Sequence, residues 1–363
     1  MRVLILWSDQ RSANMGVRVL AQGMSDLAHR VWGSDVEITC QDLGPNEAGF
    51  SLGKKSVLRD ILKRKGPIRA FLSDYDVVLD TGAGDSFTDI YGWRRLAMMS
   101  YTQRVSTKLR IPYVMGPQTI GPFNTKLGRA LARGTLRNAQ LVVARDRLSA
   151  DYALTVLGRE IDVLSTDVVF ALDRPKIEKT RDVILNVSGL LWFGKSHVDG
   201  TAYRSAVRRL ISTLISEGRA VTLLAHVVDN PTPDNDVPAI EELQLEFGGG
   251  VDSIVPSTLE EAREVIASAK VLVGSRMHAT LNALSVGVPA VPWAYSRKFA
   301  PLMGALGWRH TMDLREIDDP VPMTVSLLAE WSASAPTAEI AAVAEEGRSR
   351  MESATAKLRS LLL

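Results

Sequence analysis

Short runs of apolar, mostly β-branched residues recur along the chain, and stretches with helical spacing separate them. In the first half these runs are "RVLILW" (2–7), "VEIT" (36–39), "DVVLD" (76–80), "PYVM" (112–115) and "LVVA" (141–144). In the second half they are "VILNV" (183–187), "VTLLA" (221–225), "VLVG" (271–274) and "PAVPW" (289–293). Because the runs are continuously apolar and do not alternate, they predict parallel strands that are covered by helices on both faces.

Because strands and helices alternate throughout the 363 residues, the sequence predicts two doubly wound, Rossmann-like α/β domains. We expect an N-terminal domain over residues 1–172, a polar linker at 173–182 and a C-terminal domain over 183–335. A helix over residues 336–363 has apolar residues at helical spacing and is expected to cross back over the domain junction. Two such domains facing a cleft form the GT-B-like architecture, in which ligands lie beyond the carboxyl ends of the strands.

The composition excludes several classes of protein. The 43 basic and 41 acidic residues give a formal net charge of +2, whereas a protein that coats nucleic acid carries a basic excess. Cys40 is the only cysteine, so an intrachain disulfide and a cysteine-based metal cluster are excluded. Aspartates and histidines are spread one per loop without zinc-site spacing, so we expect no metal. The N-terminal apolar run is too short for a signal peptide and no run reaches the length of a membrane span, so we expect a cytoplasmic protein.

The most unusual segment is "KVLVGSRMHATLNALSVGVPAVPWAY" (270–295), in which an arginine and a histidine follow an apolar run. If residues 271–274 form a strand and 277–286 a helix, Arg276 and His278 lie at the first turn of that helix. Unpaired backbone N–H groups and the helix dipole favour an anion there. Arg276 would bind the anion by charge-assisted hydrogen bonds, and the imidazole of His278 can hold or release a proton. The alternative is that Arg276 forms a surface ion pair and His278 only packs or caps the helix.

Other segments also place polar residues directly after expected strands. In "MGPQTIGPF" (115–123) two Gly-Pro pairs flank Gln118 and predict a rigid, open turn, which a purely structural loop explains equally well. In "VVARDRLSADYALTVLG" (142–158) Arg145 can bind a carboxylate or phosphate through two hydrogen bonds, although an ordinary ion pair accounts for it too. The loops "DTGAGDSFTD" (80–89) and "SDQRSANMG" (8–16) contain Asp85 and Asp9, which can orient or deprotonate a sugar hydroxyl.

Together these segments resemble the polysaccharide pyruvyl transferase family. The resemblance rests on "GPQTIGPF" (116–123), "ARDRLSADYALTVLG" (144–158), "STDVVFAL" (165–172) and above all "VGSRMHATLNALSVGVPAVPWAYSRKF" (273–299). It runs through nearly the whole chain in order. In the last segment the matching residues are Arg276, His278, Gly287, Pro289, Tyr295 and Lys298.

The resemblance implies transfer of the enolpyruvyl group of phosphoenolpyruvate onto two hydroxyls of a sugar, in a glycan or a glycolipid that can be lipid-linked. The products are a pyruvate ketal and phosphate, and no cofactor is expected. The C-terminal domain would bind the donor and the N-terminal domain the acceptor. Because the donor carries a phosphate and a carboxylate, its site needs several cations and helix-terminal N–H groups. The implied donor-binding residues are Gln118, Arg145, Ser275, Arg276, Met277, His278 and Lys298, and the implied acceptor-binding residues are Asp9, Asn14 and Asp85.

Three of these residues are expected to be catalytic. His278 would protonate C3 of the donor, and such a positioned proton transfer contributes about 10²–10⁴ in rate. Arg276 would bind the anionic groups of the donor together with Arg145, with Lys298 as an accessory contact. Asp85 would activate the acceptor hydroxyl.

Two other functions are compatible with the same architecture. A GT-B glycosyltransferase with a nucleotide-sugar donor also presents phosphate to a helix N-terminus, but it usually has a carboxylate for the ribose a few residues into that helix. The corresponding stretch here, "HATLNALSVG" (278–287), contains no acidic residue. A binding protein without catalysis is the second alternative, and the presence of both Arg276 and His278 argues against it.

One further segment concerns the place of the protein in the cell. In "KKSVLRDILKRKGPIR" (54–69) the apolar residues Val57, Leu58, Ile61 and Leu62 fall on one side of a helix that is rich in lysine and arginine. Such a helix can lie on an anionic membrane surface at the inner face of the membrane. The more common arrangement is an amphipathic helix whose apolar side faces the core and whose basic side faces water.

Overall fold

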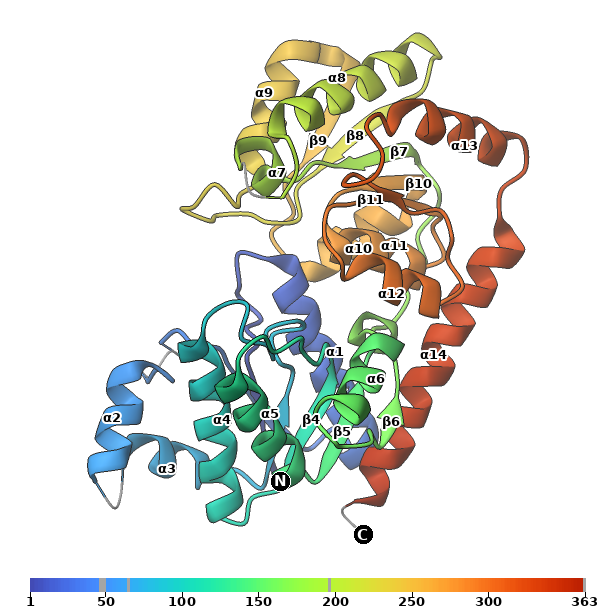
Figure 1. Ribbon diagram of the computed structural model, residues 1–363. Coiled ribbons are helices and arrows are strands. Elements are labelled where there is room, and N and C mark those ends of the chain that lie inside the picture. Colours follow the sequence, from blue (N-terminus) through green and yellow to red (C-terminus); the bar gives the residue numbers. More distant parts are fainter. Residues whose placement is uncertain (46–49, 64–65, 195–196, 362–363) are drawn as a thin grey trace. The chain divides into compact units, whose positions relative to one another are not determined.

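The computed structural model describes residues 1–45, 50–63, 66–194 and 197–361, and it divides the chain into two compact units (Figure 1). Unit 1 comprises Met1–Ser12, Val17–Leu172 and Gly347–Leu363, and unit 2 comprises Ala13–Gly16 and Asp173–Glu346. Each unit is built on a six-stranded sheet. The two parallel α/β sheets are the architecture that the strand pattern predicts.

Unit 1 has the strand order β2-β1-β3-β4-β5-β6, and its strand pairs are parallel. The strands are β1 (Arg2–Leu6), β2 (Glu37–Gln41), β3 (Val77–Asp80), β4 (Tyr113–Gln118), β5 (Leu141–Ala144) and β6 (Val163–Leu164). The helices are α1 (Met15–Trp32), α2 (Lys54–Leu62), α3 (Pro67–Leu72), α4 (Trp93–Lys108), α5 (Lys126–Asn138), α6 (Arg147–Thr155) and the 3₁₀ helix η1 (Val168–Ala171). Strands β3, β4 and β5 are buried along their whole length, as expected for continuously apolar strands.

Unit 2 has the strand order β12-β11-β10-β7-β8-β9, again with parallel pairs. The strands are β7 (Arg181–Asn186), β8 (Val221–Leu224), β9 (Val251–Ile254), β10 (Ala269–Gly274), β11 (Ala290–Ala294) and β12 (Met312–Asp313). The helices are α7 (Gly189–Phe193), α8 (Gly200–Ser216), α9 (Val237–Phe247), η2 (Gly248–Gly250), α10 (Leu259–Ala267), α11 (Met277–Ser285), α12 (Phe299–Ala305) and α13 (Val321–Ala333). The last helix, α14 (Thr337–Ser360), begins in unit 2, and its residues from Gly347 onward belong to unit 1.

The strands that the sequence analysis missed are all at sheet edges. β6 and β12 have two residues each, and β9 is the partly polar stretch "VDSI". Such short or mixed segments lack the continuous apolar run that marks the inner strands. The polar stretch 173–182 also ends earlier than expected, because β7 already begins at Arg181.

Helix α2 presents three of its four apolar side chains to solvent. Leu58, Ile61 and Leu62 are 56%, 62% and 75% exposed. Asp60, the acidic residue of this helix, points the other way: it is fully buried and accepts hydrogen bonds from Nη1 of Arg69 at 2.8 Å and from the hydroxyl of Tyr101 at 2.7 Å. Val57, the fourth apolar residue, is half-buried and packs against the core of unit 1. The core-facing arrangement therefore holds for Val57 and is wrong for Leu58, Ile61 and Leu62. Arg64 and Lys65 of the same basic segment lie outside the described residues.

No helix in the part of the chain that the structure describes combines the length and the apolarity that crossing a bilayer requires.

Candidate functional site

The site in unit 2 is built where β10 ends and α11 begins (Figure 1). Arg276 is the residue immediately before α11, so its extended backbone turns the chain from the sheet into the helix. Asn186, the last residue of the neighbouring strand β7, fixes this turn. Its Oδ1 accepts the backbone N–H of Arg276 at 2.9 Å, and its carbonyl accepts the N–H of Ser275 at 3.2 Å. The arginine is thus placed at the carboxyl edge of the sheet, as the sequence predicts.

The guanidinium of Arg276 is buried between two carboxylates. The residue is 7% exposed, its Nε and Nη2 donate to Asp236 at 3.1 and 2.6 Å, and its Nη1 lies 2.5 Å from a carboxylate oxygen of Asp234. Burial opposes the charge, but the carboxylates outweigh it and raise the pKa of Arg276 above its ordinary value. The alternative interpretation, a surface ion pair, is therefore right about the ion pair and wrong about its place, because the pair is buried.

Asp236 joins Arg276 to two other loops. Its carboxylate is fully buried and also accepts backbone N–H groups of Gly189 at 2.8 Å, His226 at 2.9 Å and Val227 at 3.0 Å. A buried carboxylate with this many hydrogen-bond donors is held rigidly. Asp236 therefore positions Arg276. Asp234 is different, because its side chain is 34% exposed.

The segment Ala13–Gly16 is bound to unit 2 although it follows the first strand of unit 1. Asn14 forms an antiparallel bridge with Val227, and the N–H of Met15 donates to the carbonyl of His226 at 3.0 Å. The side chain of Asn14 caps helix α1, because its Oδ1 accepts the N–H of Gly16 at 2.8 Å. Asn14 is expected to bind the acceptor together with Asp9, and the structure places Asn14 in unit 2 and Asp9 in unit 1.

His278 lies in the first turn of α11 and is half-buried. Its imidazole packs against Gly16, where an added methyl group would stand 2.5 Å from Nδ1. Its backbone carbonyl accepts the side-chain amide of Asn282 at 2.7 Å. The helix thus fixes the backbone of His278, and its ring lies beside Gly16, a residue that is far away in the sequence.

A second histidine lies behind the first. His226 is 1% exposed, and burial, together with the charges of His278 and Arg276, lowers its pKa well below the ordinary value of 6.5. Its Nε2 lies 3.4 Å from the amide nitrogen of Asn282, which suits a neutral ring that accepts. His226 is therefore a neutral structural neighbour of the site.

Three other residues that are expected to bind the donor belong to unit 2. The hydroxyl of Ser275 lies 2.9 Å from that of Tyr203 and is buried, so Ser275 is tied into the core. Met277 is 5% exposed. Lys298 immediately precedes helix α12 and is half-buried.

Two expected donor residues lie in unit 1. Arg145 is 1% exposed, donates from Nε to the hydroxyl of Thr119 at 2.9 Å and pairs with Asp167 at 3.2 Å. Gln118, at the end of β4, is fully buried, and its amide lies 3.4 Å from the carbonyl of Asp80. The structure thus divides the expected donor set between the two units.

The acidic acceptor residues also lie in unit 1. Asp85 is half-buried and accepts the hydroxyl of Tyr91 at 3.0 Å. Asp9 is half-buried, accepts the backbone N–H of Arg11 at 2.8 Å and lines a cavity of about 540 Å³ together with Cys40. Burial raises the pKa of the Cys40 thiol to about 11, so the thiol is not a nucleophile at neutral pH.

A comparison with models of protein families shows which family the chain belongs to. The model described as polysaccharide pyruvyl transferase matches residues 14–297, which include Asn14, Arg145, Arg276 and His278. The chain belongs to the polysaccharide pyruvyl transferase family. The resemblance in the sequence is thereby confirmed, and the protein is a member of a family of transferases that act on polysaccharides.

Several solved structures are similar in fold to this member of the pyruvyl transferase family. They include the UDP-GlcNAc 2-epimerase of Methanocaldococcus jannaschii, with 10% identity, a TM-score of 0.59 and 99% of each chain covered. The glycotransferase of kitacinnamycin has 12% identity and a TM-score of 0.54, with 100% of this chain and 99% of that chain covered. A protein of Anabaena in complex with UDP-glucose has 11% identity, a TM-score of 0.57 and 100% of both chains covered. At these identities the likeness shows the GT-B-like fold alone.

The sequence analysis missed Asn186, Asp234 and Asp236. The two aspartates lie in the loop "AHVVDNPTPDND" (225–236), together with His226. The available signal was physical: an arginine expected to be buried at a strand end needs a carboxylate partner.

Proposed function

We propose that this protein transfers the pyruvyl group of phosphoenolpyruvate to two hydroxyls of a sugar and releases phosphate. The observation that carries the proposal is the family match over residues 14–297, with Arg276 and His278 at the carboxyl edge of the unit 2 sheet. Ligands of open α/β sheets bind at this edge. The start of a nine-residue helix there adds backbone N–H groups that favour an anion.

The donor binds beside Arg276. Asp236 holds Nε and Nη2 of the guanidinium, whereas Nη1 faces the more exposed Asp234. The donor phosphate or carboxylate takes the place of Asp234 at Nη1, because a bound dianion pairs with a guanidinium as well as an aspartate does. Ser275, Met277 and Lys298 complete the unit 2 side of this donor site. Gln118 and Arg145, the other two residues that the resemblance assigns to the donor, belong to unit 1.

His278 is the general acid. It gives a proton to C3 of phosphoenolpyruvate, which turns the methylene into a methyl group and makes C2 electrophilic. One sugar oxygen then bonds to C2 and loses its proton to a base, for which Asp85 is the candidate. The second sugar oxygen bonds to C2 as the C2–O bond to phosphate breaks, and its proton leaves with the phosphate. The atoms and charges of this reaction balance without a cofactor.

The acceptor is a sugar of a glycan or glycolipid, and Asp9, Asn14 and Asp85 are its candidate contacts. The exposed apolar face of α2, flanked by basic residues, supports an acceptor at a membrane surface. On this proposal the protein is cytoplasmic and binds peripherally to the inner face of an anionic membrane.

Phosphate release tests the chemistry. Phosphate should be released from phosphoenolpyruvate only when a sugar acceptor is added, which we would search for among aryl glycosides and glycolipid precursors. His278→Gln should lower turnover about 10²–10⁴-fold, while His29→Gln, at an exposed histidine of α1, should not. Near wild-type turnover of His278→Gln at saturating donor would remove the acid assignment.

The competing hypothesis is a nucleotide-sugar donor, since proteins of similar fold are known in complex with UDP and with UDP-glucose. Helix α11 has no acidic residue to bind a ribose. Thermal unfolding separates the two: phosphoenolpyruvate should raise the melting temperature, and UDP or GDP should not.

A further inference from the structure

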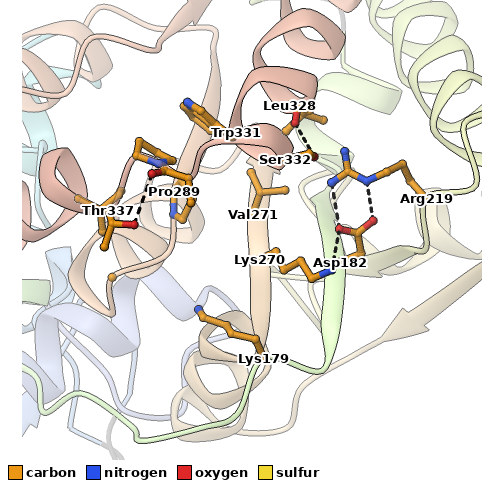
Figure 2. Close-up of a pocket in the computed structure, with 14 residues that line it drawn as sticks. Lys179, Asp182, Arg219, Lys270, Val271, Pro289, Leu328, Trp331, Ser332 and Thr337 are labelled. Atoms are coloured by element: carbon orange, nitrogen blue, oxygen red, sulfur yellow. Dashed lines mark hydrogen bonds and ion pairs between the residues drawn. The ribbon is translucent and has the colours of Figure 1, made fainter.

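Unit 2 contains a cavity of about 710 Å³ at the opposite edge of its sheet from Arg276. It lies at the amino ends of adjacent strands, where Asp182 belongs to β7, Lys270 and Val271 to β10, and Pro289 precedes β11 (Figure 2). Helix α13 and the start of α14 supply the facing wall. The donor site at the carboxyl edge is therefore separated from this cavity by the length of the strands, roughly 3.3 Å per residue.

Cations outnumber carboxylates around the cavity. Among the described residues that line it, Lys179, Lys270 and Arg219 are basic and Asp182 is acidic. Both carboxylate oxygens of Asp182 accept hydrogen bonds from Arg219, at 2.5 and 3.0 Å. The ammonium of Lys270 lies 3.9 Å from Oδ1 of Asp182, and the side chain of Lys270 is 68% exposed. Figure 2 shows Lys179 apart from this group, and its Nζ donates to the carbonyl of Ala267 at 2.9 Å. Asp182 is therefore shared between Arg219 and Lys270, and the three basic side chains of the lining face this one carboxylate.

Most of the remaining wall is apolar. Val271, Leu328 and Ile340 line it together with Trp331. The ring of Trp331 is packed against Trp308 at 5.7 Å and His310 at 5.1 Å between centroids, so its position is fixed. Apolar side chains beside unbalanced ammonium groups match a ligand that has an apolar body and an acidic end.

We propose that this cavity binds a small organic anion with an apolar body, at a site distinct from the donor site. The acidic group pairs with Lys270 and Lys179, and the apolar body lies against Val271, Leu328 and Trp331. The cavity is within the size range of pockets that hold drug-sized ligands. The inference does not depend on the pyruvyl transfer, because it concerns binding alone.

The probe is 8-anilinonaphthalene-1-sulfonate, which combines aromatic rings with a sulfonate and fluoresces in apolar surroundings. It is titrated into the full-length protein and into the double variant Lys179→Gln/Lys270→Gln. The wild-type protein should bind saturably, and the dissociation constant should rise about tenfold for each amine removed. The matched control Lys108→Gln/Lys126→Gln removes two exposed lysines of unit 1 and should bind like the wild type.

A neutral analogue, N-phenyl-1-naphthylamine, tests the charge requirement and should bind much more weakly than the sulfonate. Equal dissociation constants for the wild type and the Lys179→Gln/Lys270→Gln variant would overturn the proposal. So would equal affinity for the neutral analogue. Because both variants change exposed side chains, thermal unfolding is expected to be unchanged and serves to verify that they fold.

Discussion

The imidazole of His278 lies directly against the backbone of Gly16: a methyl group at Gly16 would stand 2.5 Å from Nδ1 and 3.0 Å from Cγ of the ring. The two residues are far apart in the sequence, and Asn14 holds Gly16 in place through its N–H. Real side-chain carbons do not approach a ring atom this closely. The glycine therefore allows the histidine to take its position at the turn between β10 and α11.

Replacing Gly16 by alanine should displace the ring of His278. Gly16 has ordinary helical backbone angles, so alanine is not strained by conformation and its effect comes from the contact alone. We expect Gly16→Ala to lower turnover with phosphoenolpyruvate by at least about tenfold, since misplacement of an acid by about 1 Å removes most of its contribution. Steady-state kinetics at saturating phosphoenolpyruvate measure this change in turnover.

The matched control is Gly134→Ala in helix α5. A methyl group there meets nothing closer than Nη2 of Arg104 at 3.8 Å, so alanine fits. We expect this variant to keep wild-type turnover and to gain about 0.5–1 kcal/mol in free energy of unfolding, because alanine suits a helix interior better than glycine. Wild-type turnover in Gly16→Ala as well would show that the ring position does not depend on Gly16.

The second prediction concerns Asp236. Because it is fully buried and binds Arg276 and three backbone N–H groups, Asp236→Asn should lower the free energy of unfolding by about 3–5 kcal/mol. Asp234→Asn removes the other carboxylate at Arg276, but from a side chain that is 34% exposed, so we expect about 1 kcal/mol or less. Urea denaturation measures both, and equal losses would contradict the distinction between the two aspartates.

The position of Arg276 was predictable from the sequence because it depends on local rules. An apolar run becomes a buried strand, the helical spacing after it starts α11, and the residue between them must lie at the carboxyl edge of the sheet. The same reasoning gave the inner strands of both sheets. Each of these conclusions uses residues that are close together in the chain.

The partners of Arg276 were not predictable, because they come from elsewhere. Asp236 is 40 positions away and Asn186 is 90 positions away. Asn14 follows β1, so the sequence assigned it to the acceptor side. It lies in unit 2 because of an isolated bridge to Val227, and an isolated bridge leaves no periodic pattern in a sequence.

The third prediction is a dependence of stability on pH that comes from His226. Its pKa is well below 6.5 in the folded chain, so only the unfolded chain takes up a proton as the pH falls through 6.5. Stability should therefore fall below this pH, by up to about 1.4 kcal/mol per pH unit. Asp80 acts in the opposite direction, because burial raises its pKa to about 6 and the folded chain then holds the proton.

Comparison with His226→Gln isolates the contribution of the histidine, since Asp80 is present in both proteins. Glutamine keeps an acceptor for the amide of Asn282. The difference in free energy of unfolding between the wild type and the variant should shrink between pH 7.5 and pH 5, as denaturation at several pH values would show. A constant difference over this range would mean that His226 takes up a proton in the folded chain as readily as in the unfolded chain.

The last prediction concerns helix α2. The triple variant Leu58→Gln/Ile61→Gln/Leu62→Gln should lose binding to vesicles that contain anionic lipid, because it removes the apolar side chains that would enter the interface. Its stability should stay close to that of the wild type, since all three side chains are exposed. Co-sedimentation at low and high salt measures the binding, which salt should weaken because the basic residues of α2 contribute to it.

The matched control changes three leucines of unit 1 that are similarly exposed: Leu127, Leu148 and Leu154, at 58%, 63% and 52%. Their replacement by glutamine removes a comparable apolar surface from helices α5 and α6. If exposed apolar area alone caused the sedimentation, this control would lose it too. If vesicle binding requires both the apolar and the basic residues of α2, only the α2 variant loses co-sedimentation. A wild-type protein that stays in the supernatant at low salt would exclude the membrane surface as its partner.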